Sequence, residues 1–324
     1  FTKAKEELGW EPEVNISRGL AQTVAWYQNN VEWWKKIKTD SNDSSNPSTV
    51  IPTPCLPAGR KVGIQNLDKT WIPDRVGDDK VRGMKGIILS GGRATRLRPC
   101  TKVTSKQLLP VYNRPMIYYP LNTLIKAGIK EVLIIVAPES AGDYLNLLGS
   151  GKQFGIKLTY EVQDEPRGLA EAFIIGENFI DDDNVTLILG DNIFEDDLST
   201  EIQSFTSGAK IFGKEVPDPE RFGVAEVDPT GRVISIEEKP KMPKSNLAAV
   251  GLYIYDNRVT EVAKHLKPSA RGEIEITDLH NWYLERGELQ LAHIKGEWVD
   301  AGTFDSLLKA QNLAKEKLQD RLII

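Results

Sequence analysis

Short apolar runs alternate with helix-like segments in the second part of the sequence, and this alternation limits the possible folds most strongly. The strands expected from this pattern span residues 85–89, 131–136, 158–163 and 185–189. A helical pattern over residues 116–127 ends at Gly128, and glycine is the usual residue directly after a helix. Strands and helices that alternate in steps of about 20 to 30 residues form parallel βαβ units. We therefore predict an α/β fold with a doubly wound sheet, in which ligands bind beyond the carboxyl ends of the strands.

The composition changes twice along the chain and divides it into three zones. Residues 1–38 contain a helical, aromatic-rich stretch that needs a partner surface to cover it. Residues 39–83 begin with small polar residues and several prolines, a composition that buries too little apolar area to offset chain entropy. We expect a helical segment, a linker, and one domain over residues 84–324.

Charge and cysteine content exclude several classes of protein. The formal net charge is −5 and no long basic run occurs, which argues against a nucleic-acid partner. The two cysteines, Cys55 and Cys100, have no metal-ligand spacing and cannot form a disulfide framework, which fits a reducing cytoplasm. No run of eighteen apolar residues is present, so we expect no membrane partner.

The loop after the first predicted strand has the residues of a phosphate site. Gly91 and Gly92 allow a tight turn and a close approach to a phosphate, and Arg93, Arg96 and Lys106 bring positive charge nearby. The pattern is neither the dinucleotide-binding motif nor the P-loop. The alternative is a surface turn with scattered arginines, which a glycine pair alone would not exclude.

Two aspartates follow apolar runs and precede glycine-containing turns. Asp191 comes after residues 185–189, and Asp300 comes after a short apolar run and before Gly302. A carboxylate at the end of a buried strand is costly unless a cation or hydrogen bonds meet it. Near a triphosphate such a group is a natural Mg²⁺ ligand. Taken singly, either aspartate is also typical of a turn or a helix cap.

Three longer motifs point to one family. Residues 91–97, 105–111 and 115–121 closely resemble the signature of sugar-nucleotide pyrophosphorylases, and among these the glucose-1-phosphate thymidylyltransferases. The resemblance runs from Met84 to about Gln311. It implies a mixed, mostly parallel Rossmann-like sheet of the sugar nucleotidyltransferase type. The implied reaction, the first step of dTDP-deoxysugar (rhamnose-type) synthesis, transfers a thymidylyl group from dTTP to glucose 1-phosphate with Mg²⁺ as cofactor.

The same resemblance assigns roles to individual residues. It implies that Arg96 and Lys106 are catalytic and that Asp191 and Asp300 hold the metal. The implied nucleotide-binding residues are Gly91, Gly92, Gln163, Gly168 and Asp191. The implied sugar-phosphate residues are Gly223, Glu238, Lys239, Val250 and Arg271. The chain departs from the family pattern at Ala94, where glycine is usual, and at Glu171, where glutamine is frequent.

The first zone has a resemblance of its own. About 36 residues within 1–38 resemble the extreme C-terminus of dTDP-glucose 4,6-dehydratases, which act on dTDP-glucose. We therefore expect a fused dehydratase upstream, or a remnant of gene rearrangement without a role. For the third zone the family implies a homo-oligomer.

Two other functions remain open at this point. A uridylyltransferase that uses UTP has the same site residues, because no residue of the sequence separates ribose from deoxyribose. A non-catalytic sensor of sugar nucleotides would use the same fold but should have lost phosphate or metal groups, and this sequence keeps Arg96, Lys106 and both aspartates.

Overall fold

The computed structural model describes residues 83–92 and 94–324. The helical segment expected for residues 1–38, with its dehydratase resemblance, and nearly all of the linker expected for residues 39–83 lie outside the described residues. Among those described, no helix has the length and apolarity needed to cross a membrane.

Four parallel strands form one half of the central sheet. In spatial order they are β5 (Lys157–Val162), β4 (Glu131–Val136), β1 (Met84–Ser90) and β6 (Asn184–Leu189). Each pair is in register over most of its length, with Ile87 opposite Leu133 on one side and Leu187 on the other. All four strands expected from the sequence are therefore present, and the predicted doubly wound core is confirmed.

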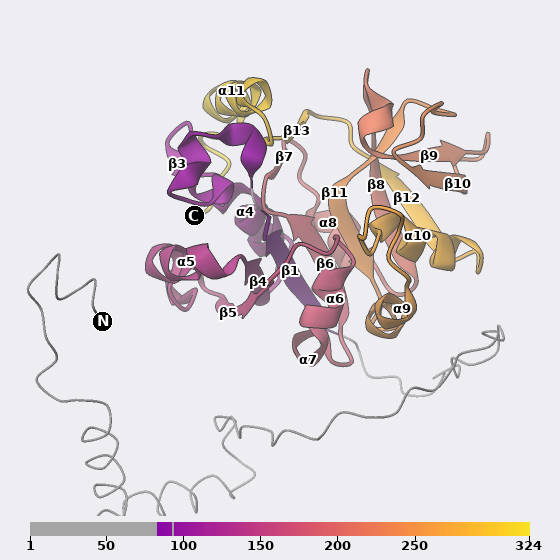
Figure 1. Ribbon diagram of the computed structural model, residues 1–324, viewed down its shortest axis with the longest axis horizontal. Helices are drawn as coiled ribbons and strands as arrows, with labels where there is room; N and C mark the ends of the chain where they lie inside the picture. The colour runs from indigo at the N-terminus through magenta and orange to yellow at the C-terminus, as the bar shows by residue number, and fades with distance from the viewer. Residues whose placement is uncertain (1–82, 93) are drawn as a thin grey trace, which may run out of the picture. The chain divides into compact units, whose positions relative to one another are not determined.

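The other half of the sheet is mainly antiparallel, which the apolar runs did not reveal. Its central strand β11 (Leu247–Tyr255) pairs antiparallel with β6, β8 and β9. The remaining strands are β8 (Ala209–Glu215), β9 (Gly223–Val227), β10 (Val233–Glu238) and β12 (Leu289–His293). The sheet is mixed, as the family resemblance implied, and Figure 1 shows its two halves meeting at β6 and β11.

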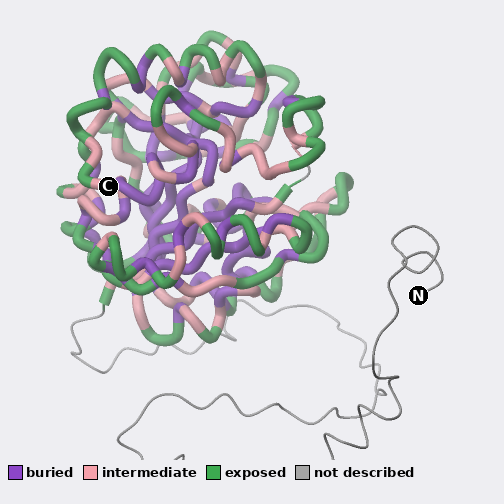
Figure 2. The backbone as a smooth tube through the Cα atoms, turned by 90° about the vertical axis from the view of Figure 1, so that its left-hand side faces the viewer, coloured by how far each residue is buried: buried purple, intermediate pink, exposed green. Residues whose placement is uncertain are grey.

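Helices cover both faces of the sheet because alternate strand residues point to opposite sides. Ile87 and Leu89 pack on one face and Ile88 on the other. The first face carries α6 (Glu171–Ile175), α7 (Glu177–Ile180), α9 (Val259–His265) and α10 (Ile276–Leu284). The second carries α4 (Tyr118–Lys126), α5 (Ala141–Leu148) and α8 (Ser199–Gln203). Figure 2 shows the resulting buried interior.

A separate two-stranded sheet joins two parts of the chain that are distant in sequence. Strand β7 (Asn192–Phe194) pairs antiparallel with β13 (Trp298–Asp300). Helix α11 (Phe304–Leu313) follows β13 directly, and a capping box between Thr303 and Ser306 fixes its start. A second small pair, β2 (Pro110–Val111) and β3 (Arg114–Pro115), leads into α4. These connections place the ends of β6 and β13 next to each other.

Candidate active site

The carboxyl groups of Asp191 and Asp300 lie together although the residues are far apart in sequence. Asp191 follows β6, and its neighbour Asn192 is paired directly with Asp300. The backbone N–H of Ala301 donates to the backbone oxygen of Asp191 at 2.9 Å. The two side-chain carboxyls are close enough to shift each other's pKa. This short β ladder therefore builds a two-carboxylate centre.

The electrostatics of this centre favour a bound cation. Burial and the nearby charge of Asp191 raise the pKa of Asp300 to about 6. Burial also opposes the charged form of Asp191, but Lys106 outweighs it through its charge and its hydrogen bond and lowers that pKa. The Lys106 ammonium is bonded directly to the Asp191 carboxylate. Lys106 balances only one of the two negative charges, so the carboxylate pair can bind a second cation.

The donor set fits Mg²⁺ bound jointly with a nucleotide. Within residues 83–92 and 94–324, no cluster of three or more acidic, histidine or cysteine side chains is arranged around a metal position. Mg²⁺ commonly takes one or two carboxylates from the protein and its other oxygens from substrate phosphates and water. Asp191 and Asp300 are such a pair.

The glycine-rich loop after β1 lies beside this centre. An added Cβ on Gly302 would lie 2.8 Å from Nη2 of Arg96 and 3.0 Å from Oδ1 of Asp300, so the guanidinium is near the carboxyl pair. Gly92 has φ +113° and open space around it. Ala94 has φ +43°, a left-handed conformation that is costly for alanine, and this is the position where the family has glycine. Arg93 lies outside the described residues.

Gln163 reaches across to the first glycine of that loop. Its backbone N–H donates to Val136 at the end of β4 (2.9 Å), and its side chain is buried. A Cβ on Gly91 would lie 2.3 Å from Oε1 of Gln163, so a larger residue there would displace the end of the Gln163 side chain. The side-chain nitrogen of Gln163 donates to Glu171 at 2.8 Å. The structure thus brings Gly91 and Gln163 together.

Gly168 joins the same region to the segment that precedes α10. It has φ +110°, and a Cβ there would overlap the backbone of Ile274. Ile274 donates to the backbone oxygen of Arg167 at 2.7 Å and accepts from Ala170 at 3.3 Å. Only glycine satisfies both the left-handed conformation and the close backbone approach.

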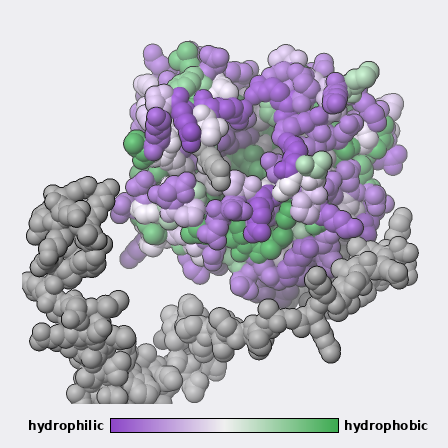
Figure 3. All heavy atoms as spheres, viewed as in Figure 1, coloured by the Kyte–Doolittle hydropathy of each residue, from purple (hydrophilic) through white to green (hydrophobic). Residues whose placement is uncertain are grey.

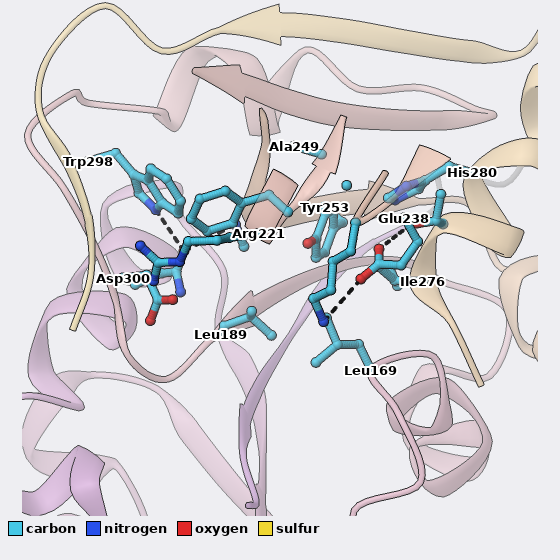
Figure 4. A pocket seen from close by; sticks show the side chains of 16 residues that line it. Leu169, Leu189, Arg221, Glu238, Ala249, Tyr253, Ile276, His280, Trp298 and Asp300 are labelled. Atoms are coloured by element: carbon cyan, nitrogen blue, oxygen red, sulfur yellow. Dashed lines mark hydrogen bonds and ion pairs between the residues drawn. The ribbon is translucent and has the colours of Figure 1, made fainter. Parts of the chain in front are cut away.

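A cavity of about 130 Å³ opens between the two halves of the sheet. The face drawn in Figure 3 is hollowed near its centre, within a mainly hydrophilic rim. In the close view of Figure 4, Asp300 and Trp298 lie at one end of the cavity and Glu238 and His280 at the other. Gly223 and Lys239 also line it.

Glu238 is held in place by three neighbours. Thr277 Oγ1 donates to it at 2.6 Å, and the Lys239 ammonium lies 3.3 Å from its carboxylate. Arg271 lies 3.4 Å from Glu238 and is bound more tightly to Glu275, at 2.8 Å. An oriented carboxylate that lines a cavity can accept hydrogen bonds from the hydroxyls of a sugar.

Two predicted sugar-phosphate residues lie away from the cavity lining. Val250 has its side chain in the core on the face covered by α4, α5 and α8, and its strand neighbours Ala249 and Gly251 line the cavity instead. Because successive residues of a strand point to opposite faces of the sheet, Val250 cannot face the cavity when Ala249 and Gly251 do. Arg271 is exposed and already paired with three glutamates.

Several residues of the site carried no clear signal in the sequence. Asn192 donates to Asp191 (3.1 Å) and accepts from Trp298 Nε1 (2.7 Å) and the Gly251 backbone (3.1 Å), so it ties the acidic centre to the cavity. Thr277 supports Glu238 from α10, and a lone threonine in a helix has no sequence signature. The position of Asn192 directly after Asp191 was the one available clue.

Comparisons with known proteins agree on one family. A model of the family described as nucleotidyl transferase matches residues 85–317. A glucose-1-phosphate thymidylyltransferase of Neisseria meningitidis is 54% identical over 239 residues, which are 72% of this chain and 83% of that protein. One from Mycobacterium tuberculosis is 50% identical over 237 residues, 72% of this chain and 82% of the relative.

Solved structures with the same arrangement include two sugar nucleotidyltransferases. A structure from Bacillus anthracis assigned as a glucose-1-phosphate thymidylyltransferase, in complex with sucrose, has a TM-score of 0.69 and 49% identity. It covers 72% of this chain and 96% of the other. A UDP-glucose pyrophosphorylase complexed with UDP-glucose has a TM-score of 0.63 and 27% identity, with 72% and 99% of the two chains covered.

Proposed function

This chain belongs to the nucleotidyl transferase family, and from that premise we propose that it transfers a thymidylyl group from dTTP to glucose 1-phosphate. The products are dTDP-glucose and pyrophosphate, and the reaction is the first step of dTDP-deoxysugar (rhamnose-type) synthesis. The observation that carries the proposal is the meeting of Asp191, Asp300 and Lys106 beside a cavity that ends at Glu238. This arrangement joins a site for phosphate chemistry to a site of the right character for a sugar.

The reaction requires no general base. A phosphate oxygen of glucose 1-phosphate attacks the α-phosphorus of dTTP in line, the new P–O bond forms, and the bond to the β-phosphate oxygen breaks with its electron pair on pyrophosphate. The attacking oxygen is already anionic. The protein therefore contributes position and charge neutralisation.

Each group of residues has a place in this reaction. The backbone at Gly91 and Gly92, with Arg96, binds the triphosphate, and Lys106 neutralises charge at the reacting phosphate. Gln163 and Gly168 receive the thymine base. On the sugar side Glu238 accepts hydrogen bonds from hydroxyls, Lys239 and Arg271 approach the sugar phosphate, and Gly223 and the backbone at Val250 border the hexose.

Asp191 and Asp300 would hold Mg²⁺ together with the triphosphate oxygens. The ion supplies further positive charge for the phosphates. The raised pKa of Asp300 supports this role, because a bound cation relieves the repulsion between the two carboxylates.

The assay that tests the function is pyrophosphate release. We expect release from dTTP that depends on both glucose 1-phosphate and Mg²⁺, with dTDP-glucose as the second product. The uridylyltransferase alternative predicts higher kcat/KM with UTP than with dTTP, and the sensor alternative predicts binding without release. Either result would overturn the proposal.

Two wider features follow from family membership and stand as proposals of the same kind. We propose that the chain forms a homo-oligomer and acts in the cytoplasm. Light scattering on the purified chain tests the first, and a single-chain mass at working concentration would contradict it. Cell fractionation tests the second, and recovery in the membrane or secreted fraction would count against it.

A further inference from the structure

Glu171 makes hydrogen bonds that the proposed reaction does not use. It is buried near the start of α6 and accepts from three donors, each within 3.2 Å. Two of them, the side-chain nitrogen of Gln163 and the backbone N–H of Arg167, meet the same oxygen Oε2. The third, Nε of Arg167, meets Oε1 at 2.8 Å. In all three of these hydrogen bonds the Glu171 carboxylate is the acceptor.

The acceptor fixes which end of the Gln163 amide faces which way. An amide has a donating nitrogen and an accepting oxygen, and only the nitrogen is compatible with a carboxylate 2.8 Å away. The carbonyl oxygen is consequently turned toward Gly91, at the loop where the nucleotide is proposed to bind. Reversing the amide would remove a charge-assisted hydrogen bond and place two acceptors against each other in a buried position.

We propose that Glu171 is a positioning residue that makes the base site selective for thymine or uracil over cytosine. It acts through Gln163 and rests on the proposed nucleotide function. Thymine and uracil present an N–H donor at N3 beside a carbonyl acceptor at O4. The fixed amide matches this edge with its carbonyl oxygen and its remaining N–H. Cytosine presents an acceptor at N3 and a donor at N4, so it requires the reversed amide.

A set of substitutions at Glu171 separates this role from a structural one. Glu171→Met keeps a similar side-chain length but removes the acceptor. Glu171→Gln keeps a carbonyl acceptor, which the two donors that face Oε2 hold in the original orientation. Glu177→Met makes the same chemical change on α7 at an exposed ion pair with Lys264 and serves as the matched control.

The readout is kcat and KM for dTTP and for dCTP, each at saturating glucose 1-phosphate. Wild type should strongly prefer dTTP. Glu171→Met should reduce the dTTP-to-dCTP ratio of kcat/KM by about tenfold or more, mainly through KM, because a mispaired polar base edge carries discrimination of this order. Glu171→Gln and Glu177→Met should keep the wild-type ratio.

The proposal is overturned if Glu171→Met folds and keeps the wild-type ratio, or if both nucleotides lose activity equally. Circular dichroism and thermal melting establish folding. If the methionine variant does not fold, Glu171→Ala takes its place with the same expectation, because water in the vacated space can donate or accept and no longer fixes the amide. Absence of pyrophosphate release from dTTP in wild type would instead overturn the proposed function itself, and the inference with it.

Discussion

Lys106 is the cation in direct contact with the carboxylate pair, and its effect on turnover can be predicted. It is half-buried and bonded to Asp191. Lys106→Met removes the charge that balances Asp191 and that would meet the reacting phosphate. We expect kcat to fall by about 10² or more, as for other charge-stabilising groups in active sites. Steady-state pyrophosphate release measures this change.

The control is Lys102→Met, which removes an exposed lysine from the same stretch of chain. It should leave turnover close to wild type. A folded Lys106→Met protein with unchanged kcat would refute the assigned role.

His280 predicts how stability depends on pH. The ring is fully buried, and neither nitrogen has a hydrogen-bond partner among the described residues. It stacks on Tyr255 and packs beside Tyr253. Burial lowers its pKa from 6.5 to about 3. Below pH 6.5 the unfolded chain binds a proton at His280 and the folded chain does not. The contribution of the neutral ring to the free energy of unfolding is therefore fully present above pH 6.5 and is lost as the pH falls toward 3.

His280→Phe removes the titrating group and keeps an aromatic ring. Urea unfolding near pH 7 and near pH 4.5 should show that the variant loses less stability on acidification than wild type does. The difference should be roughly 2.5 kcal/mol, because pH 4.5 lies about two units below the unfolded pKa of 6.5 and each unit corresponds to about 1.4 kcal/mol. Equal acid sensitivity in the two proteins would show that His280 is not the group responsible.

At the level of residues, sequence patterns identified side chains better than their surroundings. Asp191 and Asp300 could be singled out because a carboxylate after a buried strand requires a partner. The raised pKa of Asp300 could not be read from the sequence, because it depends on burial and on Asp191 lying beside it. The motif that contains Val250 was located correctly next to the cavity, but the side chain of Val250 points into the core. Which residue of a strand faces a cavity depends on how the strand is oriented in the sheet, and the sequence motif does not specify this.

Gly168 is the residue through which two elements of the site are joined. Gly168→Ala places a Cβ against the backbone of Ile274 and requires alanine to adopt a positive φ. We expect a loss of about 2 kcal/mol or more in unfolding free energy and a higher KM for dTTP. Denaturant melts and nucleotide titration of initial rates test the two effects separately.

Gly142→Ala is the matched control. Gly142 lies in α5, has nothing within 4 Å of an added Cβ, and has no positive φ. Alanine there should leave stability unchanged or raise it slightly, because it favours the helix. If both alanine variants behave alike, the close approach at Gly168 has no energetic importance.

Among the elements, the parallel strands were predictable and the antiparallel ones were not. Strands β1, β4 and β6 contain continuous buried apolar runs, which is the pattern of strands covered on both faces. Strand β5, at the edge of the sheet, alternates apolar and polar residues instead. Strand β10 has exposed, half-buried and buried residues mixed together, so its periodicity is weak. Its pairing with β9 depends on contacts that no local pattern specifies.

On the scale of the whole molecule, the site forms because a late segment of the chain, β13, pairs with β7 beside the end of β6. The first carboxylate follows β6 in the parallel half, and the second arrives on β13 after the antiparallel half is complete. The cavity proposed for the sugar is lined largely by strands of that second half. The family resemblance predicted this convergence, whereas apolar runs and glycine spacing alone predicted only that ligands would bind at the ends of the strands.

The central claim is that Asp191 and Asp300 form one metal site that is completed by the nucleotide. Titration of Mn²⁺ as a stand-in for Mg²⁺, followed by electron paramagnetic resonance in the presence of dTTP, tests it directly. We predict tight binding of the ion by wild type, and loss of that binding in both Asp191→Asn and Asp300→Asn. Wild-type affinity for Mn²⁺ in either folded variant would contradict the account.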